Sequence, residues 1–541
     1  MSAPVDRHAI AGAVRSLDRA DIAARRWYAA KDSVPTSASL AHAFALAHDA
    51  VLALVDIASD GDAADASIAI ERDPQQTHSQ PTGTGDDRSS SKHLAGHPAG
   101  PGRSGPRVDR YAIPFVHGDD GWREAGEGDG VWLALAAAIA EGRTIAALTT
   151  DGPPAGGGSG SSGAQVAAAL VCRPAAGLAE AWGDDPASLA TADEVALGRD
   201  QSNTSTVLGG RLLLKGYRRV QPGLNPDLEL TAYLSEEAGF AGVPRLAGWA
   251  EVVTRESGAA TVAMLQAFIA HAEDAYERVV EFVAGLVAAP GRASLDWATE
   301  VAADLGTLTA GLHAALATPP PDAPDLAPRE ATREELRAWR HDAHRQLNLA
   351  VSAVAAVDRD VARELEREAP AIAARVSRFE AVATTPTVMR IHADLHLGQI
   401  LVADDGYRVV DFEGEPLRSI DDRRRPDSPL RDVASLLRSL DHVARSARRR
   451  VDGRAGGHME RPGLDIEAWI ERARERFLAS YVAGVRTAGA PIPVDLDLLD
   501  AFEVAKECYE FVYAATVLPS WLWAPRDGMR WLLAHGEGSQ P

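Results

Sequence analysis

The stretch that decides the fold runs from residue 389 to residue 416 and reads Met389-Arg-Ile-His-Ala-Asp394-Leu-His-Leu-Gly-Gln399-Ile-Leu-Val-Ala-Asp-Asp-Gly-Tyr-Arg-Val-Val-Asp411-Phe-Glu-Gly-Glu-Pro416. An apolar run leads into His-x-Asp, a glutamine follows five residues after the aspartate, and two strand-like runs end in Asp-Phe-Glu. Asp394 and Asp411 each close an apolar run, where an isolated buried charge would be costly. We therefore expect both carboxylates to be functional.

This layout resembles the catalytic segment of protein kinases, which has His-Arg-Asp, an amide side chain five residues later, and then Asp-Phe-Gly. In that arrangement Asp394 accepts the proton of an incoming hydroxyl group. The amide oxygen of Gln399 and the carboxylate of Asp411 then hold Mg²⁺ against the nucleotide phosphates. The sequence therefore predicts an enzyme that transfers the γ-phosphate of ATP to an alcohol.

Other interpretations of the same segment are weaker. His392 and His396 are four residues apart, a helical spacing that suits zinc, but the glutamate of the zinc metalloprotease motif is missing between them. We expect His392 to pack beneath the loop instead. The run Asp404-Asp405-Gly406 resembles an acidic calcium loop, but it lies between two apolar runs and so predicts a hairpin turn.

The chain has 541 residues and a formal net charge of −22. A chain of this length is expected to form about two to four domains. Its acidic charge argues against nucleic acid or an anionic membrane as the main partner. Cys172 and Cys508 are too few for a disulfide framework, which favours a reducing compartment. No apolar signal-peptide core follows Met1, and no stretch reaches the ~18 apolar residues of a membrane span, so we expect a soluble cytoplasmic protein.

Two low-complexity stretches punctuate the chain. Residues 73–106 have almost no large apolar side chain, which predicts a disordered insertion, and the Gly/Ser-rich residues 152–163 predict a flexible linker. The patterns around them predict an N-terminal module over 1–190, part of a kinase N-lobe over 191–270, and a mainly helical C-lobe over 271–541 that carries the catalytic loop and the acceptor site. The expected fold class is α+β, with a bilobal protein-kinase-like architecture.

The nucleotide site has no glycine-rich loop before its lysine. We expect the hydroxyl and backbone N–H groups of a polar turn to replace it, namely those of Gln201, Ser202, Asn203, Thr204 and Ser205. Lys215 closes the apolar run Leu212-Leu-Leu and occupies the position of the kinase lysine that binds phosphates. Glu229, in the next predicted helix, is its expected ion-pair partner, with Glu236 and Glu237 as nearby rivals.

Several motifs along nearly the whole chain resemble the actinobacterial maltokinase and glucosamine kinase family. They are Arg26-Trp-Tyr-Ala-Ala-Lys31, Asp200-Gln-Ser-Asn-Thr-Ser205, Leu214-Lys-Gly-Tyr-Arg-Arg219, Pro222-Gly-Leu-Asn-Pro-Asp-Leu-Glu229, His392-Ala-Asp-Leu-His-Leu-Gly-Gln399, Asp411-Phe-Glu-Gly-Glu-Pro416 and Pro426-Asp-Ser-Pro-Leu-Arg-Asp-Val-Ala434. The resemblance implies an aminoglycoside-phosphotransferase-like, eukaryotic-kinase-like fold in which the N-terminal module is a cap.

By position, the resemblance also implies nucleotide contacts at Lys215 and at a hinge strand near Gln266 and Phe268. It implies the same metal and acceptor roles as the kinase layout. Asp432 is expected to brace the segment after the metal-binding loop.

Acceptor specificity is expected in the segment Lys506-Glu-Cys-Tyr-Glu510-Phe-Val-Tyr-Ala-Ala-Thr-Val-Leu-Pro-Ser-Trp521, because a carboxylate among aromatic rings suits a polyhydroxy ligand. Glu510 is the candidate for the amino-sugar contact and Trp521 for stacking. The segment looks more like the glucosamine kinases than the maltokinases, whose Glu-Ala-Arg-Asn-Arg-Pro-like continuation is absent. Lys506, however, stands where a glutamine is expected in glucosamine kinases, and the Arg26–Lys31 motif is maltokinase-like.

The sequence therefore predicts an ATP- and Mg²⁺-dependent sugar kinase, a monomer or homodimer, that converts D-glucosamine to glucosamine 6-phosphate. Conversion of maltose to maltose 1-phosphate and phosphorylation of an aminoglycoside remain alternatives. A binding protein without catalytic activity is disfavoured because Lys215, Asp394, Gln399 and Asp411 are all present.

Overall fold

The computed structural model describes residues 5–30, 33–60, 107–149, 168–183, 185–198, 203–289, 291, 293–319, 326–414, 419–454 and 463–535. The predicted insertion at 73–106 and the predicted linker at 152–163 both lie outside these residues. The chain divides into two compact units. The first contains 1–174, 184–222 and 248–265, and the second contains 175–183, 223–247 and 266–541.

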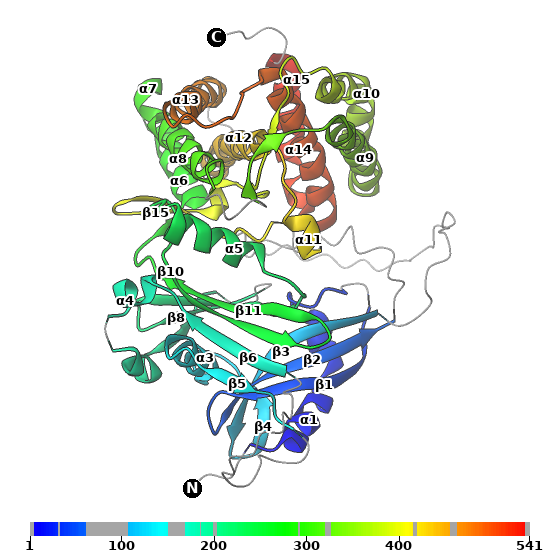
Figure 1. The fold of residues 1–541 in the computed structure, drawn as a ribbon. Coiled ribbons are helices and arrows are strands. Elements are labelled where there is room, and N and C mark those ends of the chain that lie inside the picture. Colours follow the sequence, from blue (N-terminus) through cyan, green and yellow to red (C-terminus); the bar gives the residue numbers. More distant parts are fainter. Residues whose placement is uncertain are drawn as a thin grey trace. The chain divides into compact units, whose positions relative to one another are not determined.

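An antiparallel four-stranded sheet forms the N-terminal part of the first unit (Figure 1), with the order β1 (Pro35–Ala45), β2 (Ala50–Ser59), β3 (Arg107–Gly118) and β4 (Gly121–Glu124). Residues 50–55 of β2 form a continuous apolar run, as expected of a strand segment that is covered on both faces. One face packs with α1 (Arg7–Arg15) and α2 (Arg19–Ala24), while α3 (Val131–Ala140) contacts β2 and β3.

The second sheet has seven strands, in the order β5-β6-β10-β11-β9-β8-β7. Their bounds are β5 (Thr144–Ala146), β6 (Ala168–Pro174), β10 (Leu246–Thr254), β11 (Gly258–Ala267), β9 (Leu212–Gly216), β8 (Thr204–Leu208) and β7 (Glu194–Ala196). The predicted lysine strand is therefore β9, and it pairs antiparallel with β8 and lies next to β11.

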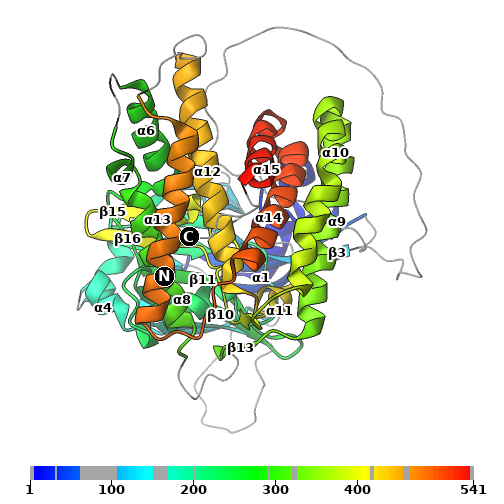
Figure 2. The same ribbon diagram turned by 90° about the horizontal axis from the view of Figure 1, so that it is seen from above.

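The second unit is mainly helical, as the sequence predicts, and its long helices pack alongside one another (Figure 2). These helices are α6 (Ala275–Ala288), α8 (Glu300–Leu316), α9 (Arg333–Val357), α10 (Arg359–Val376), α12 (Pro429–Arg454), α13 (Ile466–Thr487), α14 (Leu496–Val517) and α15 (Trp523–His535). Within this packing α12 contacts α6, α13 and α14, so it is the central helix of the unit. Among the helices in the described ranges, none is long and apolar enough to cross a membrane.

Shorter elements connect and flank these helices. They are α4 (Gly177–Ala181), α5 (Pro226–Ala232), α7 (Leu295–Ala298), α11 (Ile420–Arg423), β12 (Glu273–Asp274), β13 (Arg329–Glu330), β14 (Thr387–Val388), β15 (Ile400–Ala403) and β16 (Gly406–Val409). The hairpin predicted at Asp404-Asp405-Gly406 is confirmed, because β15 pairs antiparallel with β16 and Ala403 lies opposite Gly406. Gly406 has a φ of 126°, a backbone conformation that favours glycine at this turn.

Buried charges join α12 to α13 and α14. Arg438 of α12 is fully enclosed, and its guanidinium lies 3.0 Å from Glu503 and 3.4 Å from Glu507, both on α14. Glu503 also bonds Arg474 of α13. A buried ion pair adds little net stability, but removing one partner leaves an uncompensated buried charge. The contact between these helices therefore depends on keeping every member of the group.

We predict that Glu503→Gln lowers the free energy of unfolding by about 3 kcal/mol, because it leaves Arg438 without its nearest carboxylate. The matched control is Glu281→Gln, since Glu281 bonds Arg450 and Arg454 but is half exposed. Glu281→Gln is expected to lower the free energy of unfolding by less than ~1 kcal/mol. Urea unfolding followed by tryptophan fluorescence compares the two variants, and equal losses would contradict the prediction.

Candidate active site

The backbone before Asp394 is held by one buried carboxylate. Asp432, the fourth residue of α12, is 1% exposed and accepts hydrogen bonds from the N–H groups of His392 (2.9 Å) and Ala393 (3.0 Å). Ala393 has a φ of 71°, an uncommon conformation for a residue with a Cβ, and such strain persists only where the surroundings fix it. Asp432 supplies that restraint, and Asp394 follows directly.

Asp432 braces a different segment from the one that the sequence predicts. Asp432 was expected to brace the segment after the metal-binding loop, but its carboxylate oxygens bond the residues before Asp394 instead. The carboxylate is itself oriented by His313, whose Nε2 lies 3.3 Å away and whose Nδ1 lies 2.8 Å from the hydroxyl of Tyr481. Asp432 therefore acts within a buried chain of polar groups and contributes to the catalytic loop.

His392 has the structural role that the sequence predicts. Its ring is buried, its Nε2 lies 3.0 Å from the carbonyl oxygen of Val410, and its centroid lies 4.8 Å from that of Phe412. The N–H of Val410 donates in turn to the carbonyl of Gln399 at 3.0 Å. These contacts fix the loop that carries Asp394 against the segment that carries Asp411.

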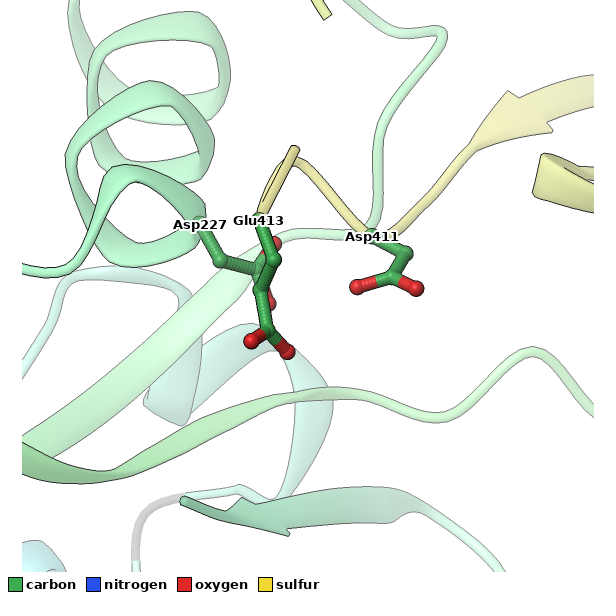
Figure 3. A group of neighbouring side chains, drawn as sticks. All are labelled: Asp227, Asp411 and Glu413. Carbon is green, nitrogen blue, oxygen red and sulfur yellow. The ribbon is translucent and has the colours of Figure 1, made fainter. Parts of the chain in front are cut away.

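Three carboxylates could hold a metal ion. Oxygens of Asp227, Asp411 and Glu413 lie within 4.8 Å of one another (Figure 3). Asp227 comes from the first turn of α5, where Asn225 caps the helix, and its Oδ1 accepts the N–H of Phe412 at 2.9 Å. Carboxylate oxygens are the donors that Mg²⁺ prefers, so the residues present suit this ion.

The predicted metal ligands lie together at this position. The side-chain amide of Gln399 is 3.3 Å from the carboxylate of Asp411, so a turn of the amide would place its oxygen beside the same ion. Sequence reasoning missed Asp227 and Glu413 as candidates. Glu413 replaces the glycine of the kinase Asp-Phe-Gly motif, which was the available signal. Asp227 lies more than 180 residues earlier in the chain, and its proximity could not be read from spacing.

Glu229 bonds two arginines, and its pairing with Lys215 remains a prediction. Both of its oxygens are engaged by arginines of its own unit, with Arg424 at 2.6 and 3.1 Å and Arg390 on the second oxygen. Arg390 is buried, and its pKa is lowered by that burial even though the carboxylate of Glu229 opposes the shift. The buried guanidinium requires an anion, which explains why Glu229 pairs with Arg390.

Residues of the predicted phosphate turn lie beside the predicted lysine. Gln201 and Ser202 are outside the described residues. Asn203 precedes β8, and Ser205 in β8 lies directly opposite Lys215 in β9. Adjacent strands therefore bring Ser205 and Lys215 together within the first unit, while their contacts with nucleotide remain predictions.

Arg218 joins the phosphate turn to the N-terminal sheet and was not predicted. Its Nε donates to the hydroxyl of Thr204 at 2.7 Å, and its guanidinium lies 5.9 Å from the ring of Trp27 and 5.3 Å from that of Trp132. Its carbonyl accepts the N–H of Ala112 in β3 at 2.8 Å. Burial lowers the pKa of Arg218 to about 10, so it remains a cation at neutral pH.

The predicted hinge residues lie at the end of β11. Gln266 is the second-to-last residue of that strand and is buried, while Phe268 follows the strand and is half-buried. The next residue after Gln266, Ala267, donates its N–H to the carbonyl of Arg245 at 2.8 Å. Their contacts with the nucleotide remain predictions.

One lysine, Lys506, lies close to both the predicted base Asp394 and the predicted sugar-binding carboxylate of Glu510. The Nζ of Lys506 lies 3.0 Å from Oε1 of Glu510 and 3.8 Å from Oδ1 of Asp394. The two predicted residues are more than 100 positions apart in the chain, and α14 brings them together. Two carboxylates and one ammonium group therefore lie together at this position.

Trp521 lies in an aromatic cluster next to this group. Its ring centroid is 4.8 Å from that of Trp523, 6.5 Å from that of Tyr276 and 6.3 Å from that of His442. His442 is also within 3.3 Å of Glu507, one helical turn before Glu510. The stacking role of Trp521 remains a prediction.

Comparison with known proteins defines the class of this chain. Residues 193–475 match the phosphotransferase enzyme family, so the chain belongs to that family. The predicted kinase-like fold and the predicted phosphotransferase class are thereby confirmed.

Individual relatives within this family that match the chain are glucosamine kinases. The chain is 32% identical over 440 residues to a glucosamine kinase of Streptacidiphilus jiangxiensis, covering 80% of this chain and 87% of the relative. It is 26% identical over 426 residues to a glucosamine kinase of Mycolicibacterium smegmatis, covering 79% and 94%. A solved glucosamine kinase in complex with glucosamine, ADP and inorganic phosphate superposes with a TM-score of 0.63 at 25% identity, covering 98% of this chain and 99% of that one. The predicted resemblance to the maltokinase and glucosamine kinase family is confirmed.

We predict that Asp432→Asn lowers kcat for phosphoryl transfer about 100-fold with little change in the KM for ATP, because an NH₂ group facing an N–H donor displaces the loop before Asp394. The control is Asp427→Asn, whose carboxylate bonds Arg431 and the N–H of Ser428. This control should retain activity within about twofold. Steady-state kinetics compare the two variants. An Asp432→Asn enzyme with normal kcat would show that phosphoryl transfer does not depend on the hydrogen bonds that Asp432 accepts.

Proposed function

We propose that this protein is an ATP-dependent kinase that phosphorylates D-glucosamine at its 6-hydroxyl group. The observation that carries the proposal is the meeting of Asp394 and Glu510 at one ammonium group, with Lys506 Nζ 3.8 Å and 3.0 Å from their oxygens. Two carboxylates and one ammonium leave a net negative charge, which attracts a cationic acceptor. Glucosamine carries an ammonium group beside several hydroxyl groups and fits this charge.

The relatives support the same acceptor. Glucosamine kinases match the chain over most of its length, and one of them has been solved with glucosamine bound. Maltose is neutral and gains nothing from the net negative charge. An aminoglycoside is a polycation and remains the acceptor to be tested against glucosamine.

The mechanism follows the kinase pattern. Asp394 accepts a hydrogen bond from the acceptor hydroxyl and takes its proton as the phosphoryl group transfers. Asp411 and Gln399 are the proposed Mg²⁺ ligands, with Asp227 and Glu413 within reach of the same position. A bound Mg²⁺ would neutralise charge on the phosphate oxygens. Lys215 is the proposed phosphate-binding cation.

Two further expectations accompany this function. ATP as the phosphoryl donor implies a cytoplasmic location, and the small sugar acceptor requires no nucleic acid or membrane partner. The chain is expected to act as a monomer or a homodimer.

The acceptor is tested by ADP release with Mg²⁺-ATP and a panel of glucosamine, glucose, maltose and kanamycin. We predict the highest kcat/KM for glucosamine. Glu510→Gln should lower kcat/KM for glucosamine about tenfold more than for glucose, because only the amino sugar loses a charged hydrogen bond. A higher kcat/KM for maltose or kanamycin would contradict the proposal, and an absence of ADP release with all four acceptors would overturn the sugar kinase assignment.

Substitutions of Asp394 and Asp411 are predicted to have different effects on kcat and on nucleotide binding. Asp394→Asn should lower kcat by about 100-fold to 10,000-fold and leave the affinity for Mg²⁺-ATP nearly unchanged, as expected of a general base. Asp411→Asn should raise the Mg²⁺ concentration required for half-maximal rate and weaken nucleotide binding. Calorimetric titration with Mg²⁺-ADP separates the two. Loss of Mg²⁺-ADP binding in Asp394→Asn would count against its assignment as the base.

A further inference from the structure

Lys506 lies at the centre of the acceptor end and is not accounted for by the kinase mechanism. It is on α14, one helical turn before Glu510, and its side chain is 21% exposed. Its ammonium has three neighbours: Glu510 at 3.0 Å, Asp394 at 3.8 Å and the ring of Tyr509 at 4.6 Å. It therefore contacts the proposed base and the proposed sugar-binding carboxylate at the same time.

The surroundings keep this lysine charged. Burial disfavours the ammonium form, but the carboxylates of Glu510 and Asp394 outweigh burial and raise the pKa of Lys506 above its usual range. The ammonium is consequently a fixed positive charge at neutral pH. Any acceptor that binds beside Glu510 meets this charge.

We propose that Lys506 is a specificity-determining residue. It makes the preference of this enzyme for an amino sugar over the corresponding neutral sugar smaller than it would be without the lysine. The inference rests on the proposed function, since it concerns the acceptor of that reaction. Lys506 already engages Oε1 of Glu510, so the ammonium group of an amino sugar has one oxygen of the carboxylate left and is repelled by a like charge.

A neutral hexose experiences the opposite effect. Its 2-hydroxyl group replaces the ammonium, so it cannot neutralise Glu510 and would leave a carboxylate without a cation in a partly buried site. Lys506 supplies that cation from within the protein and can also donate a hydrogen bond to the hydroxyl. The lysine thus weakens the binding of the amino sugar and supports the binding of its neutral analogue.

Lys506 also acts on Asp394, but this effect is common to both acceptors. The Nζ of Lys506 is near Oδ1 of Asp394, and the Nε2 of His396 is 4.0 Å from Oδ2. Loss of the lysine should change the placement of the base equally for glucosamine and glucose. The ratio of kcat/KM values for the two sugars therefore isolates the specificity effect from the positioning effect.

The experiment compares wild type, Lys506→Gln and Lys506→Arg with glucosamine and glucose as acceptors. In Lys506→Gln we expect the glucosamine-to-glucose ratio of kcat/KM to rise about tenfold, mainly through a lower KM for glucosamine and a higher KM for glucose. Lys506→Arg keeps the positive charge and should keep the wild-type ratio within about twofold.

A matched control removes a nearby cation that does not bond either carboxylate. Arg449 of α12 lies 4.5 Å from the ring of Trp523, which neighbours Trp521. Arg449→Gln should leave the ratio unchanged. Circular dichroism and thermal melting of all variants establish that each is folded.

Calorimetry keeps this inference separate from the proposed function. The Kd values of glucosamine and glucose are measured for wild type and Lys506→Gln in the presence of Mg²⁺-ADP. If the wild-type protein phosphorylates neither sugar, the proposed function is wrong and the Kd ratio alone decides the role of Lys506. An unchanged ratio in Lys506→Gln, including no measurable binding in both proteins, overturns the inference, as does a Lys506→Arg enzyme that behaves like Lys506→Gln.

Discussion

The carboxylate of Asp432 accepts hydrogen bonds from two consecutive backbone N–H groups, and the position of Asp394 depends on this contact. The two donors belong to His392 and Ala393, and Ala393 has a left-handed conformation that the local sequence does not favour. His392 extends the restraint to the segment before Asp411 through its contact with the carbonyl of Val410. A single buried anion in α12 therefore determines how the proposed base is placed relative to the proposed metal ligands.

Helix α14 has a comparable role at the acceptor end. Glu503, Glu507 and Glu510 follow one another at the spacing that places side chains on one face of a helix. Each of them has a basic neighbour: Arg438 lies near Glu503 and Glu507, His442 near Glu507, and Lys506 near Glu510. The contacts of Glu503 and Glu507 are buried between helices and hold α14 in place, while the contact of Glu510 is partly exposed at the proposed acceptor site. The buried contacts that hold the helices together thus also fix the position of Glu510, the proposed sugar-binding carboxylate.

The sequence predicted the parts of the site that are close together in the chain. Asp394 and Asp411 are recognisable because the kinase chemistry requires a short, regular spacing between them. Asp227 approaches Asp411 only through folding, and Glu229 bonds Arg390 and Arg424 because a buried guanidinium needs an anion. The Lys506–Glu510 contact follows from helical spacing, but the approach of Lys506 to Asp394 does not. Local pattern therefore predicted the chemistry and the fold class, and tertiary packing selected the ionic partners.

The arginine between two tryptophans has a consequence for how the chain can be shortened. The guanidinium of Arg218 packs with the rings of Trp27 and Trp132, and its Nε donates a hydrogen bond to Thr204 of the predicted phosphate turn. Removing the N-terminal residues would expose a guanidinium and the apolar surface beneath it, and would free one end of the turn. The N-terminal sheet and the strands around Lys215 should accordingly unfold as one cooperative segment. A shortened chain that keeps both tryptophan contacts therefore has to begin before Trp27, far upstream of residue 193, where the match to the phosphotransferase family starts.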